Sequence, residues 1–530
     1  MNAEKAGEIL GRIFAFFDGA HLVSLCLSRP GRILCAIFLG ITASFGYAPC
    51  ELWPLTLGAL TLLFLLLSAL KTRSDVFFTV LAFFAGCGTV SLWWLNFVME
   101  GFGGIPPVLS WLAVLLFALY LGCHYALFAT LALVLSRKST AAFTLLLLPA
   151  AFALADLTSG VLFTGFPWLQ FGSVAVKGPY ATFLPLAGMR GTSLLIGLTA
   201  GSLAIAARRR FVFLPVAGVI VIAGILGSSA QYTKDSKEIS AALVQGNVPE
   251  EVRLDPAQAS RSVAVYWSLS KDYFGKADLV IWPEAALPFY AESAGQLLAD
   301  LAEVSRETGS TLLTGILRRE GEERRNSLLA LDPKAGSQAH DKRRLVPFGE
   351  FVPFEEVLRP LGRIFNIPMS DFKAPKEPPS PILAHGLKFI PAICYEAVFS
   401  EALTASDRDD AGAIIMVSND QWFGPTRGPL EHLNLARVRA LELQKPMLRC
   451  TGTGVTAFVG PDGKIASAAP KSREYVLSGK VTTREGRTPY SRAGIWPWAG
   501  GVLILLALGI ICPRIKRDPK SLSSEKLVRP

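Results

Sequence analysis

Long apolar runs separated by short polar connections dominate the first 230 residues of the chain, and one further run lies near its end. A helix that spans a bilayer needs about 20 predominantly apolar residues. On this criterion the pattern predicts eight membrane helices, at residues 32–48, 54–70, 76–98, 109–135, 141–157, 184–206, 211–229 and 496–513. The segment 10–28 is also apolar, but Asp18, Gly19 and His21 interrupt it, so we expect an interfacial helix there.

The connections between these runs carry an asymmetric distribution of charge. If the eight runs alternate across the membrane, the basic clusters all fall on one side: Arg29 and Arg32, Lys71 and Arg73, Arg137 and Lys138, Arg208 to Arg210, and Arg514, Lys516 and Arg517. Two short connections on the other side, around Glu51 and Glu100, contain no basic residue. Because basic loops stay in the cytoplasm, the sequence predicts cytoplasmic termini and a periplasmic segment at 231–494.

Residues 231–494 show the pattern of an ordinary folded domain. Short β-branched runs predict buried strands at Ile239–Gln245, Asp278–Trp282, Thr311–Leu317, Phe389–Ile393 and Ala413–Ser418. Helical spacing occurs between them, at 256–274, 296–308 and 428–444, the last with Leu433, Ala436, Ala440 and Leu443 on one face. Strands that alternate with helices predict a layered α/β domain.

These patterns divide the chain into five parts. We expect an amino-terminal cytoplasmic or interfacial segment at 1–31 and seven membrane helices within 32–230. The α/β domain follows at 231–494, then the eighth membrane helix within 495–513 and a cytoplasmic tail at 514–530.

Composition agrees with this division and excludes several classes of protein. Of the 530 residues, 51% are hydrophobic and 18% are charged, whereas soluble domains carry about 25% charged residues. The net charge of +10 would suit a nucleic-acid partner, but many of the basic residues lie at the ends of apolar runs, where they orient membrane spans, so we expect no nucleic-acid partner. The eight cysteines and five histidines show no zinc-binding spacing, and no phosphate-binding loop occurs. We therefore expect neither a metal nor a cofactor.

Three residues of the α/β domain are candidates for chemistry. Glu284 follows the predicted strand 278–282, and Cys394 follows the predicted strand 389–393. Lys342 opens a conspicuous basic stretch between them. Open α/β sheets commonly bind ligands at strand ends, and a thiol beside free backbone N–H groups is favoured as the nucleophilic thiolate.

Each candidate also has a purely structural interpretation. A cysteine at a strand end is commonly a small buried apolar residue, and Cys394 could instead form a disulfide with Cys450 in an oxidising compartment. Glu284 follows a proline and could be a turn residue, and Lys342 begins a run that is typical of a surface. The residue pattern by itself leaves these alternatives open.

Several sequence blocks resemble known families. Three blocks resemble, in this order, the Glu, Lys and Cys blocks of the nitrilase superfamily: Ile281–Glu284, Lys342–Glu350 and Cys394–Glu396. Further motifs are similar to those of the apolipoprotein N-acyltransferase family: Leu345–Glu350, Ser418–Gly424, Thr164–Gly172 and Thr488–Tyr490. The likeness runs from about residue 32 to 513. It implies a membrane α-helical bundle joined to a nitrilase-like α-β-β-α sandwich.

The resemblance also implies roles for the three candidates. Cys394 would be the nucleophile, and Glu284 would be the general base that accepts its proton. Lys342 would support this pair and, together with the backbone N–H of Tyr395, stabilise an oxyanion.

Other positions match the family less decisively. Glu350 and Glu396 would orient Lys342 and the loops around the thiol, or would only form ion pairs within a loop network. Trp168 and Trp422 are expected to contact the acyl groove. The chain also departs from the family at two positions. Gly452 stands near a position where Asn is common in the family, and Asp156 stands where a longer Glu is common.

By this resemblance the chain is a bacterial inner-membrane acyltransferase. Its donor would be a phospholipid, typically phosphatidylethanolamine, and its acceptor the α-amine of a diacylglyceryl-cysteine apolipoprotein, with a Cys394 thioester between them. One alternative is a membrane-tethered nitrilase-type amidase with a site open to water. Another is a transporter, which needs ionisable groups inside its spans. Candidates for such groups are His124, Asp156 and Arg190, the last two at span ends.

Overall fold

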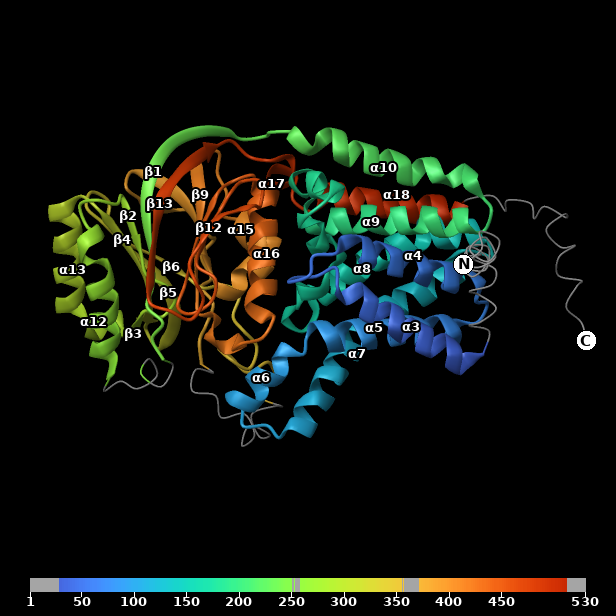
Figure 1. Cartoon of the computed structure of the whole chain (residues 1–530), viewed down its shortest axis with the longest axis horizontal. Helices are drawn as coiled ribbons and strands as arrows, with labels where there is room; N and C mark the ends of the chain where they lie inside the picture. The colour runs from blue at the N-terminus through green and yellow to red at the C-terminus, as the bar shows by residue number, and fades with distance from the viewer. Residues whose placement is uncertain (1–27, 250–251, 253–257, 355, 357–370, 512–530) are drawn as a thin grey trace, which may run out of the picture.

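The computed structural model describes residues 28–249, 252, 258–354, 356 and 371–511 of the chain. A helical bundle and an α/β domain lie side by side along the long axis (Figure 1). Two predicted segments lie outside the described residues: the interfacial helix at 10–28, apart from Ser28, and the tail at 514–530. Residues 29–31, predicted to precede the first span, belong to its helix.

Helices fill each of the apolar runs that the sequence predicts to span the membrane. Their bounds are α3 (Arg29–Ser44), α4 (Trp53–Ala69), α5 (Arg73–Ser91), α7 (Pro107–Leu135), α8 (Leu148–Ser159), α9 (Leu184–Ala207), α10 (Leu214–Leu226) and α18 (Trp496–Ile511). Proline stands in the first turn of most of them, where its missing N–H costs no helical hydrogen bond.

These helices differ in length and composition. Among the described residues, five stretches are long and apolar enough to cross a membrane: Arg73–Ser91, Pro107–Leu135, Ala142–Ser159, Pro179–Ala207 and Phe211–Ser229. Helices α4 and α18 are apolar but shorter. Helices of this length and apolar composition are typical of a membrane protein.

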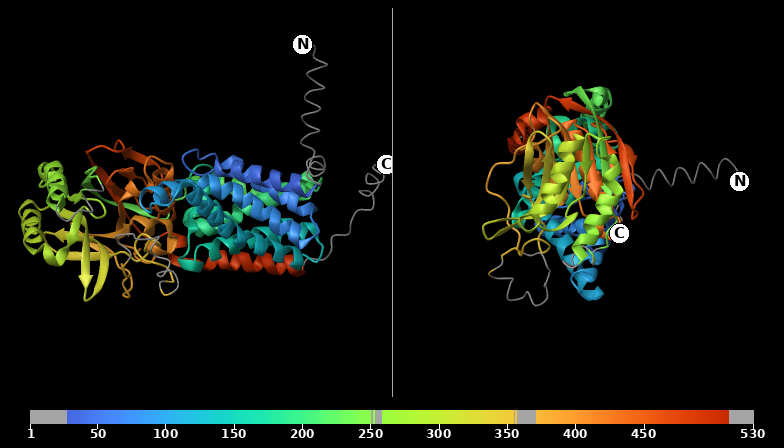
Figure 2. Two further views of the ribbon diagram at one scale, coloured as in Figure 1. Left: turned by 90° about the horizontal axis from the view of Figure 1, so that it is seen from below. Right: turned by 90° about the vertical axis from the view of Figure 1, so that its left-hand side faces the viewer.

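The predicted third span, 76–98, was wrong at its carboxyl end. Helix α5 ends at Ser91, and a separate helix, α6 (Trp94–Gly101), continues in another direction (Figures 1 and 2). Helix α6 packs against η13 (Asp420–Phe423) of the α/β domain. The apolar pattern does not mark the break, because α6 is also apolar and buries Trp94.

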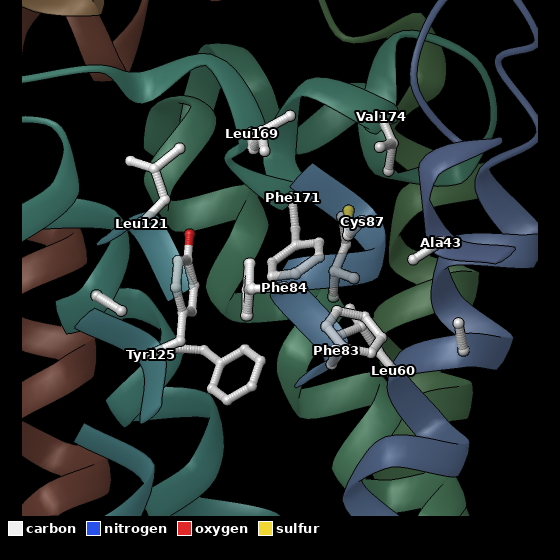
Figure 3. Packing of buried hydrophobic residues seen from close by; sticks show 14 of the residues in the cluster. Ala43, Leu60, Phe83, Phe84, Cys87, Leu121, Tyr125, Leu169, Phe171 and Val174 are labelled. Carbon is white, nitrogen blue, oxygen red and sulfur yellow. The ribbon is translucent and has the colours of Figure 1, made fainter. Parts of the chain in front are cut away.

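The bundle is held by tightly packed aromatic side chains and by small residues at helix crossings. Phe84 of α5 stacks on Tyr125 of α7, with ring centroids 4.0 Å apart. Phe171 lies beside both rings, in the segment that joins α8 to α9 (Figure 3). Gly40 lets α3 approach α5 closely, since an added Cβ would lie 1.9 Å from the carbonyl oxygen of Phe83.

The α/β domain contains two sheets. The first has the order β13-β1-β2-β4-β5-β6, and β3 pairs with β4. The second has the order β12-β11-β10-β9-β8-β7. The strands of the first sheet are β1 (Lys234–Gln245), β2 (Leu279–Ile281), β3 (Leu287–Tyr290), β4 (Thr311–Glu320), β5 (Glu323–Asp332), β6 (Gly336–Asp341) and β13 (Tyr475–Glu485). Those of the second are β7 (Ile382–Ala384), β8 (Leu387–Ile393), β9 (Ala411–Ser418), β10 (Met447–Thr451), β11 (Ala457–Val459) and β12 (Ile465–Ala468).

The two sheets pack face to face with helices on both outer faces. Ile239 and Leu243 of β1 belong to the same buried cluster as Phe389 of β8 and Ile415 of β9. Helices α12 (Ala259–Ser270) and α13 (Gly295–Thr308) cover the first sheet, and α15 (Ser400–Thr404) and α16 (Gly428–Leu443) cover the second (Figure 1). The domain is therefore an α-β-β-α sandwich, and the five predicted strands and three predicted helices are confirmed within a few residues.

Helix α16 lies between the second sheet and the membrane bundle. Its predicted apolar face packs on the sheet, for example through Leu433 and Ala440. Its opposite face contributes Leu435, Val438 and Leu441 to the cluster that holds the bundle together. The helix is therefore buried on both sides, and its outer face shares one buried cluster with the bundle.

Charged side chains also join the two parts. Arg427 donates a hydrogen bond of 2.6 Å to the carbonyl oxygen of Ala48, just beyond α3. Arg437 of α16 lies 2.5 Å from the carboxylate of Glu51. Cations near the carboxyl ends of helices are favourable, because the unpaired carbonyl groups there carry partial negative charge. The loop before α16 and the ends of the membrane helices are thus held in a defined relation.

Candidate active site

Glu284 lies in a tight turn directly after β2. The backbone N–H of Gly315 in β4 donates to the carbonyl oxygen of Pro283 at 3.1 Å. A Cβ atom at residue 315 would lie 2.6 Å from the Cα of Glu284 and 2.5 Å from the oxygen of Pro283. Only glycine lets the two strands approach so closely, and this contact fixes the main chain from which the Glu284 side chain extends.

Lys342 follows β6 and is paired with two carboxylates. Its Nζ lies 3.0 Å from Oε1 of Glu284 and 2.9 Å from Oε1 of Glu350. All three side chains are buried. Burial opposes the charge on Lys342, but the two carboxylates outweigh it and raise the pKa of Lys342 well above its usual range. The lysine therefore stays positively charged and holds the two carboxylates together.

A further buried residue, Asn326 of β5, bridges the same carboxylates. Its side-chain amide donates to Oε1 of Glu284 at 2.8 Å and to Oε1 of Glu350 at 2.9 Å. Its backbone carbonyl accepts from the N–H of Lys342 at 2.8 Å. Sequence reasoning missed Asn326, because it stands in a strand outside every motif and only the pairing of β5 with β4 brings it to the site.

The remaining carboxylate oxygens are held by the backbone. Oε2 of Glu284 accepts from the N–H of Asn419 at 2.8 Å, and Oε2 of Glu350 accepts from the N–H of Val346 at 2.8 Å. Both carboxylates thus have defined orientations. The ammonium group of Lys342 therefore lies between two carboxylates whose positions are fixed by backbone hydrogen bonds.

Cys394 stands where β8 ends and the short helix η12 (Cys394–Val398) begins. Its φ of +48° lies in the left-handed region, which residues other than glycine rarely adopt. Such strain collects at functional sites, where the surrounding structure enforces it. Cys394 and Cys450 are both free thiols, so the alternative of a disulfide between them was wrong.

The environment of the Cys394 thiol favours its neutral form. Burial raises the pKa of Cys394 above its usual range, and the carboxylate of Glu284 raises it further, whereas Lys342 lowers it. The expectation that nearby N–H groups favour a thiolate was therefore wrong in direction. A neutral thiol needs a base to accept its proton, and Glu284 is close enough to affect its ionisation.

Glu396 has a structural place beside Cys394. Its carboxylate accepts from the backbone N–H of Arg343 and of Ile393, each at 2.8 Å, and contacts Nε2 of His340 at 3.0 Å. Burial opposes ionisation, but His340 and these N–H groups together hold the pKa of Glu396 below its usual value. Glu396 thus ties the turn after Cys394 to the segment after Lys342.

The three candidates open into one cavity of about 610 Å³. Cys394, Glu284 and Lys342 line one part of it, together with Asn326 and Glu350. The rest of the lining is largely apolar and comes from α6, α7 and the segment before α9: Leu95, Val98, Met99, Phe102, Val114, Phe117, Leu162, Phe166 and Trp168. The three candidate residues therefore share one cavity with side chains of the membrane bundle.

Tyr395 and the two predicted tryptophans belong to this lining. The hydroxyl of Tyr395 donates to the carbonyl oxygen of Gly165 at 3.1 Å. Trp168 donates from Nε1 to the carboxylate of Glu431 at 2.7 Å. Trp422 packs against Phe102, with ring centroids 4.5 Å apart. Hydrogen bonds and ring contacts thus connect the α/β domain to the wall built by the bundle.

Each of the three ionisable residues that the sequence places inside the bundle has at least one partner within the protein. His124 lies 2.9 Å from the hydroxyl of Thr158, and Asp156 accepts a hydrogen bond from a tyrosine hydroxyl. Arg190 pairs with Glu401 of the α/β domain. Among the described residues, no group of histidine, cysteine and acidic side chains could hold a metal ion.

Comparison with known proteins assigns both parts of the chain. The family model described as carbon-nitrogen hydrolase matches residues 240–489, and that described as apolipoprotein N-acyltransferase N-terminal domain matches residues 39–202. The apolipoprotein N-acyltransferase of Vibrio parahaemolyticus is 33% identical over 507 residues, which cover 93% of this chain and 100% of the relative. That of Azotobacter vinelandii is 36% identical over 502 residues, which cover 92% of this chain and 96% of the relative.

The chain belongs to the apolipoprotein N-acyltransferase family.

Its relatives match the bundle as well as the sandwich, so the likeness is not confined to the hydrolase-like domain. Solved structures of other proteins also resemble about half of this apolipoprotein N-acyltransferase family member. An amidase from Nesterenkonia sp. has a TM-score of 0.36 and 16% identity, covering 51% of this chain and 99% of its own. A CN-hydrolase superfamily protein from Xanthomonas campestris has a TM-score of 0.35 and 19% identity, covering 51% of this chain and 97% of its own.

Proposed function

We propose that this enzyme takes a fatty acyl group from a phospholipid and transfers it to the N-terminal α-amine of a diacylglyceryl-cysteine apolipoprotein. The observation that carries the proposal is the single cavity in which Cys394, Glu284 and Lys342 meet apolar side chains of α6 and α7. A site walled by membrane helices suits substrates that stay anchored in a bilayer. An amidase that hydrolyses a small amide has no need of such a wall.

The first half-reaction forms a thioester. Sγ of Cys394 attacks the ester carbonyl carbon of the phospholipid while Glu284 accepts the thiol proton. The tetrahedral oxyanion accepts hydrogen bonds from Lys342 and from the backbone N–H of Tyr395. The ester C–O bond then breaks, Glu284 returns the proton to the departing oxygen, and a lysophospholipid leaves as an alcohol.

The second half-reaction uses the same groups in reverse order. The α-amine of the acceptor attacks the thioester carbon, and Glu284 accepts a proton from the nitrogen. The C–S bond breaks as the oxyanion collapses, and Cys394 recovers its proton from Glu284. An amide-linked acyl chain results, and the enzyme returns to its starting state.

The surrounding residues support these steps without forming bonds to the acyl group. An ammonium group has three N–H donors, and Lys342 directs two of them to Glu284 and Glu350. We assign the third to the oxyanion. Trp168 and Trp422 belong to the wall against which the acyl chain packs. We also propose phosphatidylethanolamine as the usual donor, on the family resemblance.

The enzyme is an inner-membrane protein, and we propose its orientation from the charge pattern. Eight spans within 32–230 and 495–513 place both the segment 1–31 and the tail 514–530 in the cytoplasm. The catalytic domain, 231–494, then lies in the periplasm. Support comes from the basic clusters, which fall on one side of the predicted spans, and from the helices that occupy these runs.

Reporter fusions test this orientation. A reporter fused after Lys234 is expected to show periplasmic activity, and one fused after Arg210 cytoplasmic activity. Alkaline phosphatase, active only in the periplasm, and green fluorescent protein, fluorescent mainly in the cytoplasm, provide paired readouts. The proposal fails if both fusion points report the same compartment.

Intact mass spectrometry tests the acyl-enzyme. Incubation of the purified enzyme with phosphatidylethanolamine, in the absence of acceptor, is expected to add the mass of one acyl group. The adduct should map to the peptide that contains Cys394 and disappear when an acceptor lipopeptide is added. Phosphatidylglycerol serves as the comparison donor. An enzyme that transfers acyl groups without ever carrying this adduct would contradict the thioester mechanism.

A further inference from the structure

A buried histidine contacts the main chain of the nucleophile. His432 of α16 is 1% exposed, and its Nε2 lies 3.0 Å from the carbonyl oxygen of Cys394. A carbonyl oxygen only accepts hydrogen bonds, so Nε2 must carry the hydrogen that is donated. None of the sequence motifs pointed to this residue, because its contact depends on how α16 packs against η12.

The other side of the imidazole ring is also held. Nδ1 lies 3.1 Å from Oδ1 of Asp420 and 3.3 Å from Nη2 of Arg449. Asp420 in turn accepts from Nη2 of Arg449 at 2.6 Å and from the hydroxyl of Ser418 at 2.8 Å. Burial opposes ionisation of Asp420, but Arg449 and His432 hold the pKa of this carboxyl well below its usual range. The ring therefore has a charged, immobile support.

Aromatic side chains fix the plane of the ring. Trp168 stacks on His432, with an interplanar angle of 21° and ring centroids 6.0 Å apart. Phe423 contacts the ring from another direction, at 5.6 Å. His432 itself belongs to the lining of the catalytic cavity. Asp420, Arg449 and the two aromatic rings thus determine where Nε2 points, and Trp168 comes from the membrane bundle.

The hydrogen bond from His432 to the Cys394 carbonyl also orients the N–H of Tyr395. The carbonyl of Cys394 and the N–H of Tyr395 belong to the same peptide unit, which is planar and trans. In such a unit the C=O and N–H bonds point in opposite directions. A hydrogen bond that fixes the Cys394 oxygen on one side therefore aims the Tyr395 N–H to the other side.

The Cys394 main chain needs such a restraint. Its left-handed conformation, with φ of +48°, is unfavourable for a residue other than glycine. Without a partner for the carbonyl oxygen, the peptide unit that joins Cys394 to Tyr395 would be freer to rotate. Such a rotation would turn the N–H of Tyr395 away from the reacting carbonyl group.

We propose that His432 is a positioning residue of the acyl transfer, which holds the Cys394–Tyr395 peptide so that the N–H of Tyr395 meets the oxyanion. The inference rests on the proposed thioester chemistry of Cys394. It predicts that His432 affects steps that pass through a tetrahedral intermediate and leaves other reactions of the thiol intact.

Two substitutions with a matched design test the inference. In His432→Gln the side-chain amide retains an N–H donor near the position of Nε2, whereas His432→Leu retains bulk and offers no donor. Loss of one oxyanion donor costs roughly 10²- to 10³-fold in kcat. We expect a loss of this size for thioester formation in the leucine variant, with little change in KM for phosphatidylethanolamine. The glutamine variant should be at least about tenfold faster than the leucine variant, since the donor remains.

Alkylation of Cys394 by iodoacetamide distinguishes a positioning role from a general structural defect. A structural defect would slow the alkylation as well, whereas loss of positioning alone would not. This displacement forms no oxyanion, so its rate in His432→Leu should stay close to wild type, as should the melting temperature. Near wild-type thioester formation in His432→Leu would overturn the inference. So would a parallel loss of alkylation, or a glutamine variant no faster than the leucine variant. Activity in Cys394→Ala would instead overturn the proposed function, independently of His432.

Discussion

Replacement of Cys394 by alanine or by serine is expected to reduce acyl transfer to background. Alanine removes the nucleophile altogether. Serine offers a hydroxyl that is a far weaker nucleophile at neutral pH, in a site whose Glu284–Lys342 pair serves a thiol. We expect losses on the order of 10⁴-fold or more, comparable to those for nucleophiles of other covalent enzymes. Transfer from labelled phospholipid to a lipopeptide measures the loss, and neither variant should trap an acyl-enzyme.

Cys450 supplies the matched control for these variants. It is also a buried, free thiol at a strand of the second sheet, but its Sγ faces the carbonyl oxygen of Ile281 at 3.2 Å. It does not belong to the lining of the cavity. Cys450→Ser should therefore retain most of the activity. Equal losses in Cys394→Ala and Cys450→Ser would indicate a shared structural role, and wild-type activity in Cys394→Ser would remove the thioester from the mechanism.

Replacement of Glu284 by glutamine is expected to slow thioester formation by about 10²- to 10⁴-fold at neutral pH, the usual contribution of a general base. The thiol remains, but its proton has no acceptor. Glutamine keeps the shape of the side chain and an oxygen for the ammonium of Lys342, so the fold should persist. Labelled phospholipid and rapid quenching give the rate of acyl-enzyme formation.

The pH dependence of the Glu284→Gln variant follows from the environment of the thiol. Burial and the carboxylate of Glu284 raise the pKa of Cys394, so the thiol is neutral at pH 7. With the base removed, the reaction depends on the thiolate that solvent produces, and this fraction rises about tenfold per pH unit below the pKa. The variant should thus recover activity between about pH 7 and pH 9 more steeply than wild type. A flat profile at the wild-type rate would show that Glu284 is not the base.

Much of the architecture follows from the local pattern of residues. Apolar runs long enough for a bilayer can form only helices there, because every backbone group must be satisfied within the segment. The strands before Glu284 and Cys394 were also predictable, since short β-branched runs bounded by turn residues favour buried strands. Sequence blocks around Glu284, Lys342 and Cys394 identified the candidates, and the structure places them in one cavity.

Contacts between distant segments were not predictable in this way. Asn326 carries no local signal, yet strand pairing brings its amide within 2.8 Å of Glu284. His432 reaches the carbonyl of Cys394 only because α16 packs over η12. The pKa of Cys394 is raised because the thiol is buried in the assembled core. The nearby N–H groups that the sequence suggested do not reverse this shift.

Local residue patterns suffice to show which segments are apolar helices and which runs form the sandwich, and together with the family resemblance they indicate three side chains for chemistry. These properties depend on hydrophobic period and local motifs, which lie within a few residues of one another. Only the tertiary structure decided that α5 ends at Ser91, that α16 is buried on both faces, and that one cavity joins Cys394 to the membrane helices. Such features arise from packing between residues far apart in the chain, and local periodicity does not indicate which distant residues become partners.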